Sequence, residues 1–487
     1  MISPETTAFL PVIAWVALPF LLGFSVYLLP QLGRYLSVLV GLISLGYALP
    51  QIFDAPVTLS LLDSFGVTLL IDSLSGYFIL TNALVTLAVA IYGWRDRSSF
   101  FYTQMIILHG SVNAVFVCAD FISLYVALEV ISIAAFLLIT YPRTNRSIWV
   151  GLRYLFISNT AMLFYLLGAV LVYSYSGSFG FAGLDAAPPE AVALISLGLL
   201  TKGGVFVSGL WLPLTHAEAE TPVSALLSGI VVKTGVFSLV RCALLSDATS
   251  QIVGIFGVAA ALLGVVFAIF EADTKRTLAF STISQLGLVL VAPTAAGGYA
   301  LTHGLAKATL FLTAGNLPSR QFHQLRQGTI RSSSWVLLML AGLSVAGFPL
   351  AGGFGSKLSV FKVVAPWQSI ALNVAVVGTA IVMAKFIFLP HSGTSTAKPS
   401  KPELLLAPGM LLMALTLVNG FYLDLYTRPN ILKALLIIGI GWLAYVGLSR
   451  LSLKLPRVAE QFDHLIGVMS LMLTLLFWMV LRNALPL

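Results

Sequence analysis

Long apolar runs, separated by short polar or basic connections, repeat along almost the whole chain. A bilayer core of about 30 Å needs roughly 20 predominantly apolar residues in one helix. Glycine and proline inside a run do not exclude it, because membrane helices tolerate both. The runs predict up to sixteen membrane-spanning helices, at about 8–29, 32–50, 68–92, 103–119, 121–141, 147–174, 189–213, 222–244, 250–271, 274–292, 296–317, 333–364, 366–390, 404–423, 430–449 and 462–482.

Composition supports this interpretation. Only 9% of the 487 residues are charged and 59% are hydrophobic, with a mean hydropathy of +0.99. A soluble globular chain carries about 25% charged residues. Too few polar residues are present to coat a soluble enzyme of this length, so that class is excluded.

The basic residues are distributed unevenly between alternate connections, which predicts the orientation. The odd-numbered connections hold fifteen: Arg34, Arg95, Arg97, Arg143, Arg146, Lys275, Arg276, Arg320, Arg326, Arg331, Lys398, Lys401, Arg450, Lys454 and Arg457. The even-numbered connections hold only Arg241, Arg428, Lys433 and Arg482. The positive-inside rule predicts cytoplasmic odd connections and both termini on the opposite side. The net charge of +8 then requires no nucleic-acid partner.

Motifs for cofactors are missing from the sequence. Cys118 and Cys242 form no CxxC pair, so we expect no iron–sulfur cluster, metal site or disulfide framework. Neither a GxGxxG after a strand nor a GxxxxGK[ST] motif is present to hold a nucleotide. The N-terminal run lacks a preceding basic residue, which argues against a cleaved signal peptide. We therefore expect no cofactor and no covalent catalysis on this chain.

Charged residues inside the apolar runs are the candidate functional residues. They are Glu129, Arg153, Lys202, Lys233, Lys307, Lys357, Lys362 and Lys385. An isolated charge at the bilayer centre costs at least about 2.5–3.5 kcal/mol. Two interpretations compete: a polar axis that carries ions, or long side chains that reach the interface from helix ends. Arg153, Lys362 and Lys385 lie nearer helix ends and fit the second.

Three of the candidates, Glu129, Lys202 and Lys233, lie at the centres of their runs. Glu129 has about nine apolar residues on each side, and its side chain is too short to reach the interface. Lys202 is followed at once by Gly203 and Gly204, which predicts a broken helix whose backbone lines a cavity. Lys233 is also central, with Gly235 close behind. We interpret all three as functional.

The other candidates occupy two further runs. Lys307 and His303 are four residues apart and therefore share one helix face, which suits a proton relay. A lone buried histidine is as often a hydrogen-bonded core residue, so both interpretations of His303 stay open. Lys357 follows Pro349 and three glycines, which predicts a second broken helix.

The two lysine-bearing broken helices are five helices apart. An odd interval places two similar units in opposite orientations, as in many transporters. The chain is thus predicted to be an all-α polytopic membrane protein with about 14–16 transmembrane helices and two inverted five-helix repeats. The expected divisions are 1–100 for N-terminal helices, 101–245 for the first repeat (helices 4–8), 246–390 for the second repeat (helices 9–13) and 391–487 for C-terminal helices.

Six sequence motifs occur in a recognisable order over about residues 100–365. They are LYVALE with Glu129, LLTKGGVF…WLP with Lys202, HAEAETPVSALLSGIVVKTGVFSLVR with Lys233, DTKRTLAFSTISQLG at 273–287, THGLAKATLFLTAG with His303 and Lys307, and SVAGFPLAGGFGSK with Lys357. In these motifs the chain resembles the antiporter-like membrane subunits shared by respiratory complex I and Mrp-type cation/proton antiporters. Its length and its HAEAETPVSALL segment look most like the D-type Mrp subunit.

The resemblance implies a central chain of ionisable residues that moves protons. Glu129 and Lys202 would be the interacting acid–lysine pair, and Lys233 the connecting lysine. His303 with Lys307 would form the relay of the second repeat. Lys357 would stand where the family has a terminal proton donor or acceptor.

Three function classes remain open at this stage. The first is a subunit of a monovalent cation (Na⁺)/proton antiporter. The second is a proton-pumping membrane-arm subunit of an NAD(P)H–quinone oxidoreductase, and the third is a non-conducting scaffold. Retained buried charges argue against a scaffold, which would gain stability by losing them. We expect other membrane subunits as partners, in a bacterial plasma membrane or in a thylakoid membrane.

Overall fold

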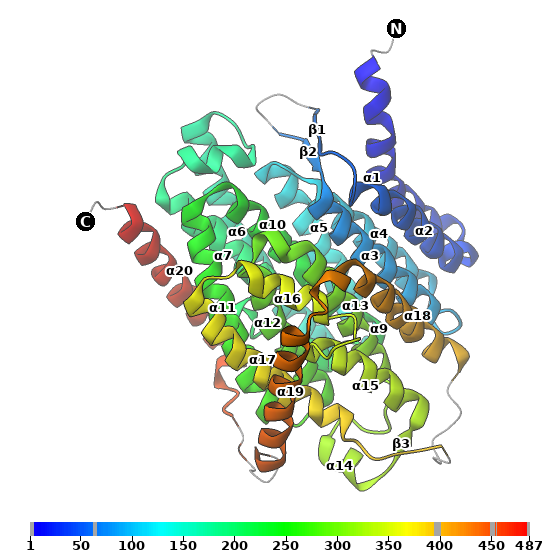
Figure 1. Cartoon of the computed structure of the whole chain (residues 1–487). Coiled ribbons are helices and arrows are strands. Elements are labelled where there is room, and N and C mark those ends of the chain that lie inside the picture. Colours follow the sequence, from blue (N-terminus) through cyan, green and yellow to red (C-terminus); the bar gives the residue numbers. More distant parts are fainter. Residues whose placement is uncertain (1–3, 62–65, 394–400, 449–452, 454, 485–487) are drawn as a thin grey trace. The chain divides into compact units, whose positions relative to one another are not determined.

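The computed structural model describes residues 4–61, 66–393, 401–448, 453 and 455–484, and these ranges are mostly helical (Figure 1). The basic residues Lys398, Arg450 and Lys454 lie outside the described residues. The helices of the first half are α1 (Pro4–Leu28), α2 (Gly33–Gln51), α3 (Ser73–Tyr92), α4 (Ser99–Val117), α5 (Phe121–Ile139), α6 (Asn145–Ser176), α7 (Pro189–Lys202), α8 (Leu212–Glu218), α9 (Thr221–Leu226) and α10 (Val232–Leu245).

The second half adds further helices, and each half contains one small strand pair. The helices are α11 (Asp247–Phe270), α12 (Thr274–Leu290), α13 (Ala296–Ala314), α14 (Phe322–Gln327), α15 (Ser332–Ala346), α16 (Phe354–Val363), α17 (Pro366–Ile387), α18 (Pro402–Asn419), α19 (Arg428–Leu448) and α20 (Phe462–Ala484). β1 (Val57–Ser60) pairs antiparallel with β2 (Thr68–Ile71), and β3 (Ile330–Arg331) pairs parallel with β4 (His391–Ser392).

The helices confirm a multi-pass, all-helical membrane protein. Within the described ranges, thirteen helices are long and apolar enough to cross a membrane. The pair α12 and α13 passes the same test together, with a bend of 109° between the two helices. The expected single run at 333–364 is instead two short helices, α15 and α16, separated by a break.

Several helices begin at a polar residue that caps their first turn. Asp72, Asp120 and Asp273 accept hydrogen bonds from the backbone N–H groups of Ser75 (2.9 Å), Ser123 (2.7 Å) and Arg276 (3.0 Å). Such caps satisfy N–H groups that have no partner inside the helix, at a gain of about 1 kcal/mol each. The short connections therefore stop and restart helices at defined positions.

The chain divides into two compact units. Unit 1 comprises Met1–Gly203, Ile230–Ile252 and Met469–Leu487, and unit 2 comprises Gly204–Gly229 and Val253–Val468. These units reflect packing, whereas the expected repeats at 101–245 and 246–390 reflect helix order, so the repeats stay a prediction. The boundary at the end of α7 falls directly after Gly203, the residue that follows Lys202.

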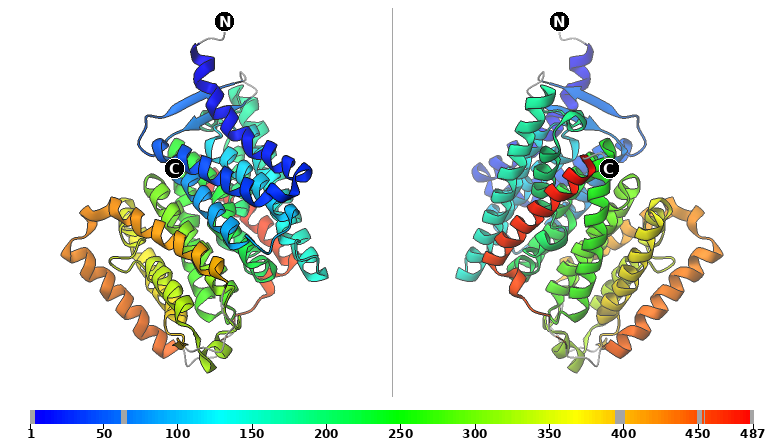
Figure 2. Two further views of the ribbon diagram at one scale, coloured as in Figure 1. Left: turned by 90° about the vertical axis from the view of Figure 1, so that its right-hand side faces the viewer. Right: turned by 90° about the vertical axis from the view of Figure 1, so that its left-hand side faces the viewer.

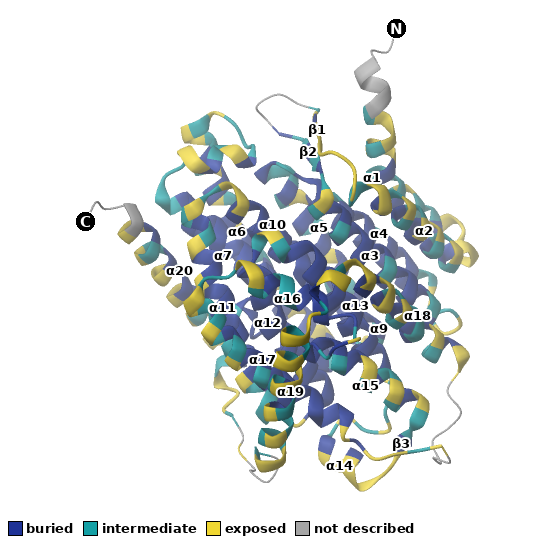
Figure 3. Cartoon of the chain, in the orientation of Figure 1, coloured by how far each residue is buried: buried dark blue, intermediate teal, exposed yellow. Residues whose placement is uncertain are grey.

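Unit 2 has an inner helix and an outer apolar surface. In unit 2, α13 packs against α9, α12, α15, α16 and α18, and all of its residues are buried. Helices α17 and α19 run side by side in both views of Figure 2. The outer faces of α18 and α19 are exposed, as the yellow segments of Figure 3 show. Exposed apolar side chains on such helices suit contact with lipid or with other membrane subunits.

The odd-numbered connections gather at one end of unit 1. The guanidinium of Arg34 lies 5.3 Å from the ring of Trp94, and the backbone N–H of Ser98 donates to the Tyr141 hydroxyl (3.3 Å). The even-numbered connections also meet one another, since Ala119 N–H donates to the Thr68 carbonyl at 2.8 Å. Successive helices of unit 1 therefore run between two opposite ends.

Unit 2 repeats this arrangement. Strands β3 and β4 join two odd-numbered connections, and a bridge between Asp273 and Gln321 joins the first of these to a third. Because that bridge closes the bent pair α12–α13, the chain enters and leaves the pair at the same end. The connections before α12 and after α13 therefore lie at the same end of unit 2, whether or not the pair crosses the whole membrane.

Candidate functional site

Lys202 is the last residue of α7, and its side chain is buried against α5 and α6. Its ammonium donates to the Leu128 carbonyl (2.9 Å), to the Ser158 hydroxyl (2.9 Å) and to the Ser132 hydroxyl. Ser132 and Ser158 also bond to each other at 3.1 Å. The ammonium is therefore held by neutral acceptors from two neighbouring helices.

Glu129 lies on α5 in the turn that holds Lys202. Its side chain is half-buried, and its charge acts on Lys202. Among the residues that the structure describes, no ion pair within 4.0 Å joins Glu129 and Lys202. The Oε1 atom of Glu129 is buried and has no hydrogen-bond partner among those residues. The two charged groups are thus close enough to interact electrostatically, but they do not form an ion pair in the part of the chain that the structure describes.

The break after Lys202 brings α10 close to α7. Gly204 takes a left-handed conformation with φ of +64°, which glycine adopts without strain. A Cβ atom at Gly235 would overlap the backbone nitrogen of Gly203. Lys233, fully buried, lies two residues before Gly235 and just after a π-helical turn, Leu227–Val231. Such turns often occur at functional sites.

His303 and Lys307 lie on α13, where both side chains are buried. The Lys307 ammonium donates to the Leu278 carbonyl on α12 at 3.2 Å. Because α13 is a single uninterrupted helix, residues four positions apart lie on the same face, as expected from the sequence.

Lys357 lies on α16, after the second broken helix. Helix α15 is capped by Gly347, which has a left-handed φ of +83°, and α16 starts seven residues later. The Lys357 ammonium donates to the Val345 carbonyl at 2.6 Å. Carbonyls at a helix C-terminus lack helical partners and attract cations. The break therefore supplies the acceptor for the lysine.

A small cavity of about 10 Å³ connects this region to α13. Its lining includes His303, Tyr299, Gln285, Ser344 and Val345, the residue whose carbonyl binds Lys357. That volume accommodates about one water molecule. The structure thus groups the candidates by unit, with Glu129, Lys202 and Lys233 in unit 1 and His303, Lys307 and Lys357 in unit 2.

One lysine and one arginine outside the candidate set are also buried. Lys385 is buried, and its ammonium donates to the carbonyls of Ala268 (3.0 Å) and Glu271 (2.5 Å) at the end of α11. Arg153 is also buried, with its guanidinium 5.8 Å from the ring of Trp149. Both side chains are thus enclosed by protein near helix ends, and their reach to the membrane interface stays a prediction.

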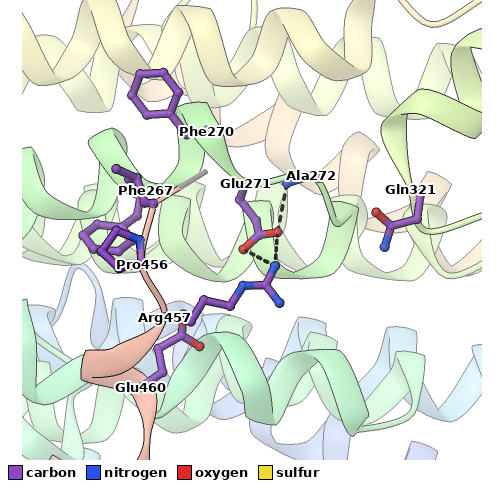
Figure 4. Close-up of a pocket in the computed structure, with 9 residues that line it drawn as sticks. Phe267, Phe270, Glu271, Ala272, Gln321, Pro456, Arg457 and Glu460 are labelled. Carbon is purple, nitrogen blue, oxygen red and sulfur yellow. Dashed lines mark hydrogen bonds and ion pairs between the residues drawn. The ribbon is translucent and has the colours of Figure 1, made fainter. Parts of the chain in front are cut away.

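The turn between α11 and α12 carries a buried ion network in unit 2. Glu271 accepts from Arg276 (2.8 Å) and from Arg457 (3.0 Å), and Arg276 also binds Glu460 (2.6 Å). Burial raises the pKa of the Glu271 carboxyl, but the neighbouring guanidinium groups outweigh burial and hold that pKa below its usual value. Glu271, Arg457 and Glu460 border a cavity of about 460 Å³, which Phe267 also lines (Figure 4).

Sequence reasoning misses several residues of this arrangement. Ser132 lies three residues after Glu129 on one helix face, a spacing that could have indicated it. Ser158 carries no comparable signal. His216 stands in the HAEAETPVSALL segment, yet nothing in that segment distinguishes it from its neighbours; it is fully buried on α8.

Comparisons with known proteins identify the family of the chain. The family model described as NADH:quinone oxidoreductase/Mrp antiporter, TM, matches residues 118–382. The D-type subunit of the Na(+)/H(+) antiporter of Alkalihalophilus pseudofirmus is 26% identical over 460 residues, covering 84% of this chain and 93% of the relative. The N-type subunit of the NADH-quinone oxidoreductase of Desulforudis audaxviator is 30% identical over 337 residues, covering 60% of this chain and 66% of the relative.

The fold is also similar to that of a chain in the Mrp complex from Dietzia sp. DQ12-45-1b. The TM-score is 0.71 at 20% identity, over 93% of this chain and 98% of that chain. The matched range 118–382 is more than half of the 487 residues and includes Glu129 and Lys357. The chain therefore belongs to the NADH:quinone oxidoreductase/Mrp antiporter family of membrane subunits.

Proposed function

We propose that this chain is the ion-translocating subunit of a multi-subunit monovalent cation (Na⁺)/proton antiporter. Protons move along a chain of buried groups: Glu129, Lys202, Lys233, His303, Lys307 and Lys357. The observation that carries the proposal is the buried Lys202 ammonium, which has neutral acceptors and lies near a carboxylate that forms no ion pair with it among the described residues. Such a lysine can gain and lose a proton as the neighbouring charge changes.

The mechanism follows from the mutual stabilisation of opposite charges. An ionised Glu129 favours the charged form of Lys202, and a charged Lys202 favours an ionised Glu129. A cation that approaches Glu129 competes for the carboxylate and weakens its hold on Lys202. Lys202 then releases its proton toward Lys233 on α10, which packs against α7. No bond other than those to the proton forms or breaks.

The second group of residues carries the proton onward. Lys307 and Lys357 each have a backbone carbonyl as acceptor, at 3.2 Å and 2.6 Å. A water molecule in the cavity beside His303 would connect α13 with the carbonyl that holds Lys357. In this proposal the chain carries no cofactor, and the perturbing charge is the cation itself.

The partners are other membrane subunits of one complex, in a bacterial plasma membrane. The relative from Alkalihalophilus pseudofirmus is named as one subunit of an antiporter, and the exposed apolar faces of α18 and α19 offer contact surfaces. Both termini face the non-cytoplasmic side, as the fifteen-to-four distribution of basic residues implies.

The second candidate function is a proton-pumping subunit of an NAD(P)H–quinone oxidoreductase. The 30% identity to a quinone oxidoreductase subunit favours it. The perturbing charge would then come from redox chemistry in another subunit. Neighbouring genes separate the two: Mrp-type subunits for the antiporter, quinone-binding and iron–sulfur subunits for the oxidoreductase.

The acid–lysine pair is tested by substitution in the assembled complex. Glu129→Ala and Lys202→Ala should each abolish cation-driven proton transport, because the remaining group loses the opposite charge that switches it. Glu129→Asp should retain partial transport, since the charge remains while the reach shortens. Proton flux in vesicles that contain the assembled complex measures the effect.

Lys362→Ala is the matched control, because Lys362 is exposed on α16. Lys385 is unsuitable as a control, since its ammonium is buried among carbonyls. Near-normal transport by Glu129→Ala in an assembled complex would contradict the proposed function.

A further inference from the structure

His216 is a buried histidine outside the chain of residues proposed above. It lies on α8, which packs against α12, and its ring stacks on Phe311 of α13 with centroids 4.6 Å apart and planes at 16°. All three helices belong to unit 2. The stacking fixes the plane of the ring and leaves its edge, with both nitrogens, able to bond.

Neither ring nitrogen of His216 has a hydrogen-bond partner among the described residues, although both atoms are buried. The contrast with His109 in unit 1 is informative. There, Nε2 contacts the Ser44 hydroxyl (2.8 Å) and Nδ1 contacts the Thr86 hydroxyl (3.0 Å). Buried polar groups in proteins normally find a partner in the protein or in water. His216 therefore has two sites for hydrogen bonds that water or an incoming group can fill.

Two cations act on the His216 ring, one from each helix that faces it. Lys307 of α13 is fully buried, and Lys275 lies in the first turn of α12. The Lys275 ammonium donates to the Ala219 carbonyl (2.8 Å), three residues after His216. His216 thus belongs to the electrostatic surroundings of the buried lysine in the proposed relay.

The other side of this group reaches toward solvent. Glu218 and Glu220 follow His216 closely, both are half-buried, and both act electrostatically on Lys275, as do Asp273 and Arg320. Arg320 is 43% exposed at its side chain and is paired with Asp273 at 2.7 Å. A charged, partly solvated cluster therefore lies within a few residues of a buried histidine.

We propose that His216 relays protons between this charged cluster and Lys307. One ring nitrogen accepts a proton through water from the side of Glu218 and Glu220, and the other nitrogen releases its proton toward Lys307. Imidazole suits this step, because one nitrogen is a donor and the other an acceptor in its neutral form. The inference rests on the proposed function of Lys307 and adds the route by which protons reach it.

The first test measures water access in the assembled complex and needs no variant. Hydrogen–deuterium exchange at the histidine C2 carbon, followed by mass spectrometry over about pH 5–9, reports each histidine separately. His216 should exchange at least about tenfold faster than His109, because water reaches its unpartnered ring nitrogens. Exchange of His216 as slow as that of His109 would overturn the relay.

The second test measures transport by His216→Phe, which keeps an aromatic ring against Phe311 and removes proton binding. Transport should fall at least about tenfold in a complex that assembles normally, whereas His109→Gln and the exposed His323→Gln should keep the wild-type pH profile. Normal transport by His216→Phe alongside an inactive Lys307→Ala would overturn only the relay. Normal transport by Lys307→Ala as well would overturn the proposed function itself.

Discussion

The ammonium groups of Lys202, Lys357 and Lys385 are all buried, but they bind different kinds of acceptor. Lys385 binds carbonyls at the end of α11 and lies 4.6 Å from the ring centroid of Phe322, an arrangement that caps a helix. Lys357 binds one carbonyl at a helix break. Lys202 binds two hydroxyls and a carbonyl, beside a carboxylate. Hydroxyl groups can both accept and donate, so they adapt to a change in the charge of the lysine.

The two serines around Lys202 yield a prediction at this scale. Ser132→Ala and Ser158→Ala should each reduce transport roughly tenfold, because a hydrogen bond to a charged group contributes about 1.5–3 kcal/mol. Proton flux per assembled complex is the measurement. Ser111→Ala is the control: Ser111 is equally buried, but its hydroxyl bonds to the Ile107 carbonyl of its own helix (2.9 Å). Unchanged flux in both Lys202-facing variants would refute a role for the hydroxyls.

At the scale of elements, broken helices place the ionisable groups. Helix α7 ends at Lys202 and α15 ends shortly before Lys357, and in each case glycines follow. The breaks leave backbone groups without helical partners at membrane depth, which is tolerated only where protein or a cavity satisfies them. Close packing of α10 against the first break depends on Gly203 and Gly235.

Gly235→Ala tests this packing. The added methyl group would meet backbone atoms of Gly203, so α7 and α10 must move apart, at a cost of about 1–3 kcal/mol. The Tm of the purified chain in detergent should fall. Gly439→Ala, in α19, has no atom within 4 Å of the new methyl group and should leave Tm equal or slightly higher. Equal Tm values for both variants would show that the close approach is unimportant.

The ion network at the α11–α12 turn predicts a pH dependence of stability. The pKa of Glu271 is lower in the folded than in the unfolded chain, so its ionised form stabilises the fold. This contribution is present above the unfolded-state value of about 4.3 and is lost as the pH falls through the lower, folded-state pKa. Glu271→Gln should lower Tm at pH 7, by the equivalent of about 1.5–3 kcal/mol for a lost hydrogen bond to a charged group, because Glu460 still compensates Arg276.

Acid titration of the same two proteins provides the discriminating measurement. Below about pH 4, the wild-type Tm should fall toward that of Glu271→Gln, and the difference between them should shrink. A difference in Tm that stays constant down to acidic pH would mean that the charge of Glu271 does not stabilise the fold.

At the scale of the whole molecule, the connections of each unit alternate between two ends. Strand pair β3–β4 holds the connections at 328–331 and 388–393 together, and both belong to the basic, odd-numbered set. The grouping agrees with the orientation expected from charge, in which this set faces the cytoplasm. In unit 2 the basic connections are thus held at one end of the helices.

Cysteine labelling tests the orientation. Ser392→Cys should resist a membrane-impermeant maleimide in intact cells and react after lysis, because the distribution of basic residues predicts that its connection faces the cytoplasm. Asp54→Cys, in an exposed even-numbered connection, should react from outside. The native Cys118 and Cys242 are both buried and should contribute little background. The reverse labelling pattern would overturn the orientation.

The sequence alone was sufficient to predict the membrane class and nearly all of the helices, while the depth of the six candidate residues in the membrane stays a prediction. These properties are local: a run of about 20 apolar residues predicts a span, and a charge at its centre is buried wherever the helix lies. Both helix breaks were also predictable, because glycines follow Lys202 directly and precede Lys357. The family followed from the order of motifs over residues 100–365, and the match at 118–382 supports it.

Which groups surround each charge depends on how the helices pack, and only the folded structure shows it. Ser132 and Ser158 lie 70 and 44 residues from Lys202, and the carbonyl of Ala268 lies 117 residues from Lys385. A lysine near a helix end reaches the interface or caps another helix according to what packs beside it, which its own run does not encode. The surroundings of His216 depend likewise on the packing of α8, α12 and α13. Depth in the membrane is a property of one segment, whereas hydrogen-bond partners are a property of several helices packed together.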